Sequence, residues 1–396
     1  MVPGTVPGTK KESLIMIKTI GYLIFASIYY ISCLFPLNDK RVLCIMTHDD
    51  GEDGNVSLLV SELKRLKRGY NFSYITKSET ESVKSLKDVR KLLSFFFIKP
   101  YHMARSKIIL MDNVFLPMAY IRIKGNVKVI QLWHGTGTIK KFGQDVNSGR
   151  LKVLEKRANR NITHLIVNNK QTAKLYAKVF GVDLDRVYPV GLPKTDDIFN
   201  RMQRINRDKT NAEKNIIYEK YNLPMEKKLI LYAPTFRDMN LGSDAVLKHV
   251  EEMARKLPMN YILGLRLHPY VARMAQKLHI DNVCDLSGER SLSLLMMASD
   301  LLITDYSSII FEFCITKKPM IFFAYDLDDF TSSGRGFYND YVSYVPGPIA
   351  RNSKEVIDII NEEEFSLDMI QSFNRDNFPN LDGKATERII ELISNK

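Results

Sequence analysis

The sequence predicts a two-domain α/β protein in which two doubly wound parallel sheets face one cleft. After Pro36, short apolar runs alternate with amphipathic stretches, which is the pattern of repeated βαβ units. A polar, charge-dense stretch at residues 200–220 divides these runs into two series. Residues suited to chemistry follow several of the apolar runs, where the strands of doubly wound sheets end and ligands bind.

The first series predicts an N-terminal Rossmann-like domain at residues 38–200. Helical spacing is present at Val56–Leu66 and again at Gln171–Phe180. The predicted strands are the apolar runs Val42–Met46, Lys107–Met111, Val127–Leu132, His164–Val167 and Val187–Val190.

The second series predicts a C-terminal Rossmann-like domain at residues 201–396. We expect it to open with one polar surface helix over Asn200–Lys220 and to end with an amphipathic helix over Ala385–Ile393. The predicted strands are Lys228–Ala233, Tyr261–Leu267, Asn282–Leu286, Leu301–Thr304 and Pro319–Ala324.

The N-terminal segment, residues 1–37, is predicted to be a leader followed by a membrane-associating helix. No charged residue occurs from Thr19 to Asn38, which is close to the roughly 20 residues that span a bilayer. The tyrosines within this run favour the membrane interface: Tyr22, Tyr29 and Tyr30. The alternatives are a secretory signal and a buried helix of the first domain.

The formal net charge of +12 indicates an anionic partner. The lysines are spread along the chain, and no zinc-finger spacing, basic heptad array or RNA-binding aromatic signature is present, so nucleic acid is disfavoured. An anionic membrane surface or a phosphate-rich polymer fits better. The four cysteines are scattered without metal-ligand spacing, which is typical of a reduced compartment.

A first candidate site follows the strand that ends near Leu132. There Trp133, the only tryptophan, precedes His134, Gly135 and Thr136. Glycine lets the backbone turn sharply beside the histidine, so the imidazole can reach a ligand. A turn in which the histidine bonds only its own loop is the structural alternative.

A second candidate site is the strand end that carries Arg266 and His268. Their two-residue spacing places both on one face of a strand, and Pro269 ends that strand. A guanidinium and an imidazole on one face can meet one phosphate-bearing ligand. Capping of the local backbone by His268 is the alternative.

A third candidate site joins a strand to an apolar helix at residues 309–315. Hydroxyl and carboxylate side chains at such a junction cap the helix and leave backbone N–H groups for a phosphate. The residues concerned are Thr304, Asp305, Ser307 and Ser308. Weaker signals near the same predicted cleft are Thr235, Arg237 and Arg335.

Several enzyme classes are excluded by missing motifs. The chain contains no G-x-x-x-x-G-K-[ST], G-x-G-x-x-G or G-x-S-x-G pattern, which argues against P-loop hydrolases, dinucleotide enzymes and α/β-hydrolases. No clear D-x-D metal motif stands out either. We therefore expect no metal ligands and no cofactor.

Taken in order, these motifs resemble the CDP-glycerol glycerophosphotransferase family of teichoic acid synthesis. The resemblance covers roughly residues 40–390 and departs from the family pattern at Gly137, Thr138, Lys194 and Thr195. The motifs that carry it are Trp133-His134-Gly135-Thr136, Gly191-Leu192-Pro193, Thr235-Phe236-Arg237, Arg266-Leu267-His268-Pro269, Thr304-Asp305-Tyr306-Ser307-Ser308 with Phe311-Glu312, and Arg335-Gly336-Phe337-Tyr338.

The resemblance implies a GT-B-like fold, an acceptor-binding first domain and a CDP-polyol-binding second domain. It further implies a peripheral enzyme on the cytoplasmic face of the cell membrane that moves glycerol phosphate or ribitol phosphate from a CDP-polyol to a lipid-linked disaccharide or polymer. In that scheme His134 is the base for the acceptor and His268 contacts the donor phosphates. Thr304, Ser307 and Ser308 complete the phosphate site, with Glu312 among the substrate-binding residues.

Two other functions are consistent with the residues. The first is a GT-B glycosyltransferase that uses a nucleotide sugar, because a His-Pro pair and a serine pair would serve there too. The second is a non-catalytic membrane scaffold that binds an anionic polymer through its net charge of +12. CMP release from a CDP-polyol would distinguish the three.

Overall fold

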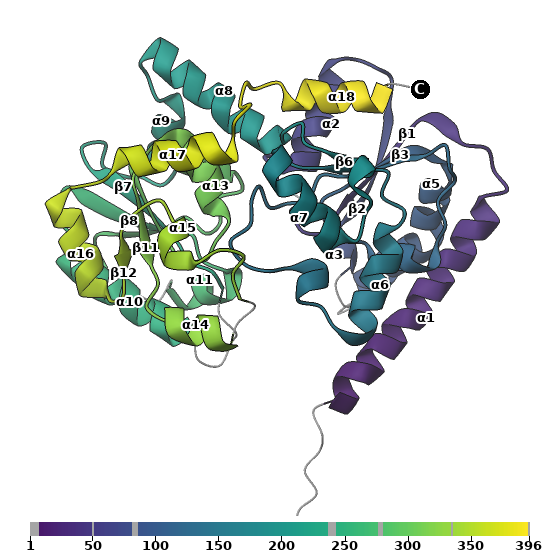
Figure 1. The fold of residues 1–396 in the computed structure, drawn as a ribbon, viewed down its shortest axis with the longest axis horizontal. Helices are drawn as coiled ribbons and strands as arrows, with labels where there is room; N and C mark the ends of the chain where they lie inside the picture. Colours follow the sequence, from purple (N-terminus) through teal and green to yellow (C-terminus); the bar gives the residue numbers. More distant parts are fainter. Residues whose placement is uncertain are drawn as a thin grey trace, which may run out of the picture.

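Two α/β domains lie side by side in the computed structural model (Figure 1). It describes residues 8–49, 51–80, 86–236, 243–275, 280–333 and 336–394, with backbone alone at 8–17, 86–88, 243 and 333. Each domain is built around a six-stranded sheet, and the pairings within both sheets are parallel. The predicted pair of doubly wound sheets is thereby confirmed.

The first sheet has the strand order β2-β1-β3-β4-β5-β6. The chain turns outward after β1 to form β2 and then returns to form β3 on the other side of β1. This reversal creates a topological switch point between β1 and β3, where doubly wound sheets bind ligands. The strands are β1 (Asn38–Met46), β2 (Asn71–Thr76), β3 (Ser106–Met111), β4 (Lys128–Gln131), β5 (His164–Ile166) and β6 (Val187–Tyr188).

Helices cover both faces of the first sheet, so its strands are buried on both sides. They are α1 (Gly8–Ser32), α2 (Asn55–Arg65), α3 (Lys77–Thr80), α4 (Leu86–Leu93), the π-helix η1 (Ser94–Ile98), α5 (Lys99–Arg105), α6 (Gly149–Asn159) and α7 (Lys170–Phe180). The 3₁₀ turns are η2 (Leu116–Tyr120), η3 (Gly143–Asp145) and η4 (Leu184–Arg186).

The second sheet has the order β12-β11-β10-β7-β8-β9, with its switch point between β7 and β10. The strands are β7 (Lys228–Ala233), β8 (Tyr261–Leu265), β9 (Val283–Asp285), β10 (Leu301–Thr304), β11 (Met320–Phe323) and β12 (Ile349–Ala350). The helical elements are α9 (Ala212–Lys220), α10 (Ser243–Lys256), α11 (Pro269–Ala275), α12 (Leu292–Ala298), α13 (Ile309–Phe313), η5 (Cys314–Thr316), α14 (Leu327–Ser333), α15 (Tyr341–Tyr344), α16 (Ser353–Glu362) and α17 (Leu367–Asn377).

The polar stretch between the domains differs from the single helix predicted for Asn200–Lys220. It forms two helices, α8 (Pro193–Asp208) and α9. Lys209 ends α8 in the left-handed region with φ of 52°, and the side chain of Asn211 then caps α9 by accepting from the Lys214 N–H. Polarity alone predicts one helix here, but Lys209 ends α8 and Asn211 begins α9.

The N-terminal helix α1 is partly a component of the first domain. Phe25 and Tyr29 are buried, and the Phe25 ring lies 5.3 Å from that of Phe95. The opposite face is exposed, with Ile20 at 58% and Ile31 at 60%. Among the described helices, none has both the length and the hydropathy required to cross a bilayer. The expected helix exists, but the structure does not support its description as an apolar membrane helix.

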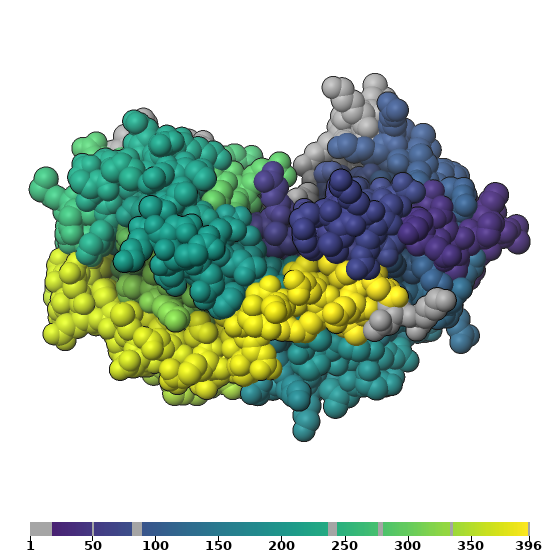
Figure 2. All heavy atoms as spheres, turned by 90° about the horizontal axis from the view of Figure 1, so that it is seen from above, coloured from purple at the N-terminus to yellow at the C-terminus, as the bar shows by residue number. Residues whose placement is uncertain are grey.

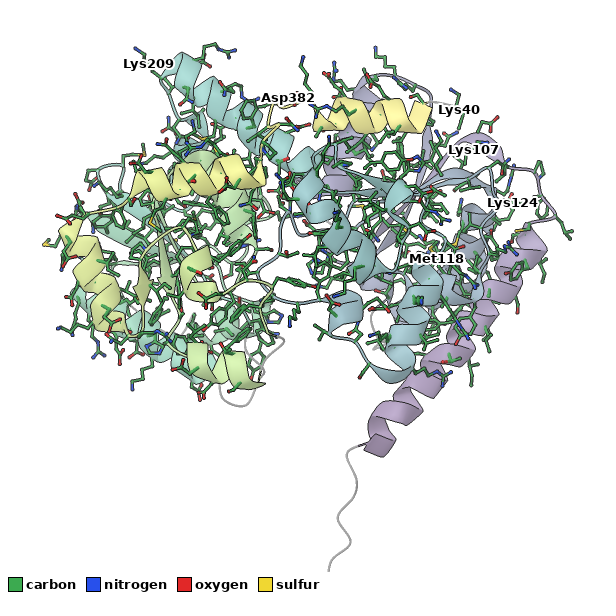
Figure 3. All side chains as sticks on the ribbon, viewed as in Figure 1. Lys40, Lys107, Met118, Lys124, Lys209 and Asp382 are labelled. Atoms are coloured by element: carbon green, nitrogen blue, oxygen red, sulfur yellow. The ribbon has the colours of Figure 1, made fainter. Side chains whose placement is uncertain are left out.

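Two chain crossings connect the domains. Helix α8 begins against the first domain and places Ile198 in the core of the second. After α17 the chain returns through the turn at Asp382 (Figure 3) to α18 (Ala385–Ser394), whose Ile389, Ile390 and Ile393 pack in the first domain. Figure 2 shows this yellow C-terminal segment extending across both domains. The terminal helix, assigned from sequence to the second domain, therefore completes the core of the first.

Asp196 ties the two crossings together. Its buried carboxylate on α8 accepts hydrogen bonds from the N–H groups of Ala385 (3.1 Å) and Thr386 (2.7 Å) and from the Thr386 hydroxyl (2.9 Å). A carboxylate at a helix N-terminus satisfies donors that have no partner within the helix. One side chain therefore caps the start of α18 and fixes it to α8.

We predict that Asp196→Ala lowers the free energy of unfolding by about 2 kcal/mol or more, because buried N–H groups lose a charged acceptor. The neighbouring Asp197→Ala is the control. Asp197 pairs only with Arg201 among its described polar contacts, at 2.9 Å and one turn away, and such pairs contribute about 0.5 kcal/mol. Urea denaturation of both variants measures the difference. Equal losses in the two variants would contradict the role given to Asp196.

Candidate active site

Polar side chains gather at the carboxyl ends of β1, β3 and β4, beside the switch point of the first sheet. His48 and Asp49 follow β1, Asp112 follows β3, and Trp133 and His134 follow β4. The Asp112 carboxylate accepts from the N–H groups of Thr47 (3.0 Å), His48 (3.2 Å) and Asp49 (2.7 Å). Asp112 therefore shapes the loop that carries His48.

His134 has a defined tautomer. Its Nδ1 lies 3.0 Å from the carbonyl oxygen of Asp112, and since a carbonyl only accepts, Nδ1 carries the hydrogen. Nε2 is then the basic nitrogen of the ring. The imidazole of His48 lies parallel to that of His134, with ring centroids 3.4 Å apart and planes 6° apart.

Both stacked histidines are held in the neutral form. Burial and the neighbouring His48 lower the pKa of His134 to about 3, with Lys194 adding to the effect and the Asp112 carbonyl and Asp49 opposing it. Burial also lowers the pKa of His48, and Lys77 and Lys194 act in the same direction against Asp49. A neutral imidazole is the form that accepts a proton.

Trp133 adopts a backbone conformation that is rare for a non-glycine residue, with φ of 55°. Its N–H donates to the Gln131 Oε1 (2.9 Å), and its carbonyl accepts from the Asn55 Nδ2 (2.9 Å). The indole packs against Phe142 and Phe180, with centroids 5.4 and 5.0 Å away. These contacts hold the turn that places His134 beside Asp112.

Lys194 is a buried cation beneath this site. Its Nζ lies 3.1 Å from the Asp49 Oδ2, and its backbone N–H donates to the Asn55 Oδ1 (3.0 Å). Burial alone would lower the pKa of Lys194, but Asp49, Glu312 and Asp53 outweigh it and raise that pKa. The position noted in the sequence as a departure from the family pattern therefore carries a paired charge.

In the second domain, the strand ends carry the other predicted residues, several of which support the backbone. The Asp305 carboxylate accepts from the Thr235 N–H through both oxygens (2.8 and 3.1 Å), and the Thr304 hydroxyl donates to the Ala233 carbonyl (2.7 Å). Ser307 Oγ accepts from the Ile309 N–H at 3.4 Å, and Ser308 is the N-cap residue of α13. Asp305 and Thr304 thereby join the ends of β7 and β10.

His268 is exposed at the start of α11. Its Nδ1 accepts from the Tyr270 N–H (3.3 Å), and its ring centroid is 4.0 Å from that of Phe236. Burial lowers the pKa of His268, and so does the charge of Lys77, which belongs to the first domain. Lys77 therefore acts on the pKa values of both His48 and His268, which belong to different domains.

Arg266 makes different hydrogen bonds from those of His268. Its Nη1 donates to the carbonyls of Ser287 (2.9 Å) and Glu289, in the loop after β9. The guanidinium therefore anchors this loop. Arg237 and Arg335 fall outside the described residues.

Direct contacts close the domain interface next to the histidines. Thr136 donates to the buried Glu312 Oε1 (2.5 Å), and burial raises the pKa of Glu312. Lys140 Nζ lies 3.3 Å from Thr235 Oγ1. Thr136 and Glu312, both predicted to bind substrate, thus bond each other across the interface.

Sequence reasoning missed His48, Asp49, Asn55 and Lys77. His48 and Asp49 follow a predicted strand, so the rule that found His134 would have found them. The roles of Asn55 and Lys77 depend on contacts with distant segments. Across the described part of the chain, no group of three or more histidine, cysteine, aspartate or glutamate side chains is arranged to hold a metal ion.

Two doubly wound sheets with opposed strand ends and a histidine on each side define an enzyme of the GT-B-like class. The family model described as CDP-Glycerol:Poly(glycerophosphate) glycerophosphotransferase matches residues 27–395. The chain belongs to this family, as its motifs predicted.

Individual relatives agree with this assignment. The teichoic acid poly(ribitol-phosphate) polymerase of Bacillus spizizenii is 34% identical over 97% of this chain, which spans 61% of that relative's length. The teichoic acid ribitol-phosphate primase of the same species is 29% identical over 94% of this chain and 95% of the primase. The solved structure of the wall teichoic acid polymerase TagF has a TM-score of 0.76 at 24% identity, covering 98% of each chain, and shows the shared fold.

We predict that His48→Asn raises the pKa of His134 by about one unit or more, because it uncovers the His134 ring and removes the repulsion that a protonated His48 exerts at acidic pH. NMR titration of the histidine ring protons measures this, with His134→Gln assigning the signal. In the unsubstituted protein the His134 signal should show no titration between pH 5 and 8. His164→Asn, at the start of β5, is the control and should leave His134 unchanged. An unaltered His134 titration in His48→Asn would contradict the role of the stack.

Proposed function

We propose that the chain transfers glycerol phosphate or ribitol phosphate from a CDP-polyol to a lipid-linked acceptor or a growing teichoic acid-like polymer, with release of CMP. Family membership supports the reaction type. The observation that carries the proposal is the neutral His134, whose Nδ1 donates to the Asp112 carbonyl and whose Nε2 is the basic nitrogen.

In the proposed reaction, an acceptor hydroxyl oxygen attacks the phosphorus that carries the polyol. Its proton passes to Nε2 of His134 as the new P–O bond forms. The bond from that phosphorus to the oxygen shared with CMP breaks, and CMP leaves with the electron pair. A positioned base contributes roughly 10² to 10⁴ in rate.

Negative charge accumulates on the phosphate oxygens during this step. In the proposed reaction His268 supplies hydrogen bonding and Lys77, whose charge acts on His268, supplies positive charge to stabilise such oxygens. We propose that these groups replace a metal ion, so that the reaction needs neither a metal nor a cofactor.

We further propose that the chain binds the cytoplasmic face of an anionic cell membrane. Helix α1 packs beside η1, where Gly21 lies against the Phe96 ring. Exposed apolar residues on these two segments include Ile20, Ile24, Ile31, Phe97 and Ile98. Such a patch is typical of a membrane or protein contact.

Basic residues accompany this patch. Lys18, Arg90 and Lys91 are exposed on α1 and α4, and cations there favour anionic head groups. Lys124, labelled near the C-terminal end of α1 in Figure 3, donates to the Cys33 carbonyl (3.1 Å) and fixes that end of the helix. CDP-polyol, as a nucleotide, is supplied on the cytoplasmic side.

Turnover measurements test the proposed reaction. With a lipid-linked disaccharide acceptor in EDTA, the protein should release CMP from CDP-glycerol or CDP-ribitol and lengthen the acceptor by polyol phosphate. His134→Ala should leave CDP-polyol affinity nearly unchanged while kcat falls by roughly 10² or more. His268→Ala should weaken donor binding as well. Calorimetry and CMP-release kinetics measure both.

His164→Ala, away from the strand carboxyl ends, is the matched control and should retain activity. Turnover only on nucleotide sugars would replace the proposal with glycosyl transfer. A requirement for magnesium would contradict the proposal that the reaction needs no metal. Loss of donor affinity in His134→Ala, with affinity retained in His268→Ala, would reverse the two histidine roles.

Vesicle binding tests the proposed membrane contact. The double variant Ile24→Ser/Ile31→Ser should bind anionic vesicles at least roughly tenfold more weakly, because each exposed isoleucine loses apolar contact with lipid. Co-sedimentation measures binding. A deletion of residues 1–37 would remove Phe25 and Tyr29 from the core, so substitutions give the cleaner test.

The matched control replaces Ile216, an exposed isoleucine on α9 in the second domain, with serine. That variant should bind vesicles like the unsubstituted protein. If the double variant also binds normally, α1 does not mediate membrane contact.

A further inference from the structure

A cavity of about 360 Å³ adjoins His134 within the first domain. Its wall contains Trp133, Phe142 and Phe180, three aromatic rings packed against one another. His48 and His134 also line it. Any group held in this cavity therefore lies beside the histidine to which we assign the base.

Part of the polar wall comes from α6 and the segment before it. Glu155 lines the cavity and accepts from the Asn147 Nδ2 (2.6 Å). Asn159 is 2% exposed and donates through Nδ2 to the Phe180 carbonyl (2.9 Å). Its Oδ1 is buried and has no hydrogen-bond partner among the described residues. An unpartnered buried oxygen costs free energy unless a ligand or water donates to it.

Charge distinguishes this cavity from the cleft between the domains. Among its described lining residues there is no lysine or arginine, and Glu155 contributes a carboxyl group. A phosphate would meet a like charge here, whereas two hydroxyl groups of one ligand can donate to Glu155 and to Asn159. The wall therefore matches a ligand that is neutral and rich in hydroxyl groups.

The volume limits the size of that ligand. At about 360 Å³ the cavity is near the lower end of the roughly 300–1,000 Å³ typical of small-molecule sites. It equals the liquid volume of about twelve water molecules. One sugar ring or one short polyol fits this space, and a nucleotide does not.

We propose that this cavity is the acceptor subsite and that it binds a neutral, hydroxyl-rich unit, a sugar ring or polyol, with one hydroxyl presented to His134. This inference rests on the proposed function for the direction of transfer. The aromatic wall contacts the carbon skeleton, and Glu155 and Asn159 accept hydrogen bonds from the hydroxyl groups. The phosphates of the acceptor stay outside the cavity.

Trp133 provides a direct test, since it is the only tryptophan in the chain. Its fluorescence should change saturably when the full chain is titrated with ribitol, glycerol or methyl N-acetylglucosaminide. Glycerol 3-phosphate should bind at least about tenfold more weakly, because of Glu155. The measurement needs neither donor nor turnover, so its failure is distinguishable from failure of the proposed reaction. Comparison of the three neutral ligands separates a sugar site from a polyol site.

Glu155→Gln preserves the shape of the wall and removes its charge. It should lower the affinity for the preferred neutral ligand by about tenfold and reduce the discrimination against glycerol 3-phosphate. The affinity for CDP-glycerol should stay unchanged. Asp185→Asn, which removes an exposed carboxylate on η4, is the charge-matched control and should bind like the unsubstituted protein. Absence of a fluorescence response, equal binding of glycerol 3-phosphate, or an unaltered Glu155→Gln would overturn the proposal.

Discussion

A buried ammonium group needs negative charge nearby, and the pairing of Lys194 with carboxylates determines how the site is arranged. Asp49 supplies the partner at 3.1 Å, so the loop after β1 has to lie against the start of α8. The fields of Glu312 and Asp53 add to that pairing. The same positive charge disfavours protonation of His48 and His134. One cation thus links the geometry of the strand ends to the protonation state of the site.

The fold was largely predictable because ten of the twelve described strands lie on apolar runs of the sequence, whereas β2 and the two-residue β12 were not predicted. The carboxyl ends of β4, β8 and β10 were located in this way, and with them His134, His268 and Asp305. What the pattern could not give is the partner of each side chain. Thr304 donates to a backbone carbonyl and Arg266 anchors a loop, and the substrate contacts expected of both stay predictions.

The N-terminal helix shows a second reason why the sequence predictions and the structure differ. Hydropathy averaged along a segment does not distinguish a face that packs on protein from one that contacts solvent or lipid. Phe25 and Ile24 are adjacent in sequence, yet Phe25 is buried while Ile24 is 45% exposed. Only the position of α1 against η1 and η2 separates the two faces. His48 and Lys77 likewise gain their significance from neighbours that are remote in sequence.

The return of α18 to the first domain also affects the order of folding. Ile389, Ile390 and Ile393 share a core with Val42 of β1, so this core joins segments about 350 residues apart. During synthesis, the second domain can assemble on its own local contacts while the first still lacks part of its apolar core. Contacts of such high sequence separation form slowly. A nascent chain would therefore present an unfinished first domain to chaperones until α18 has been synthesised and packs.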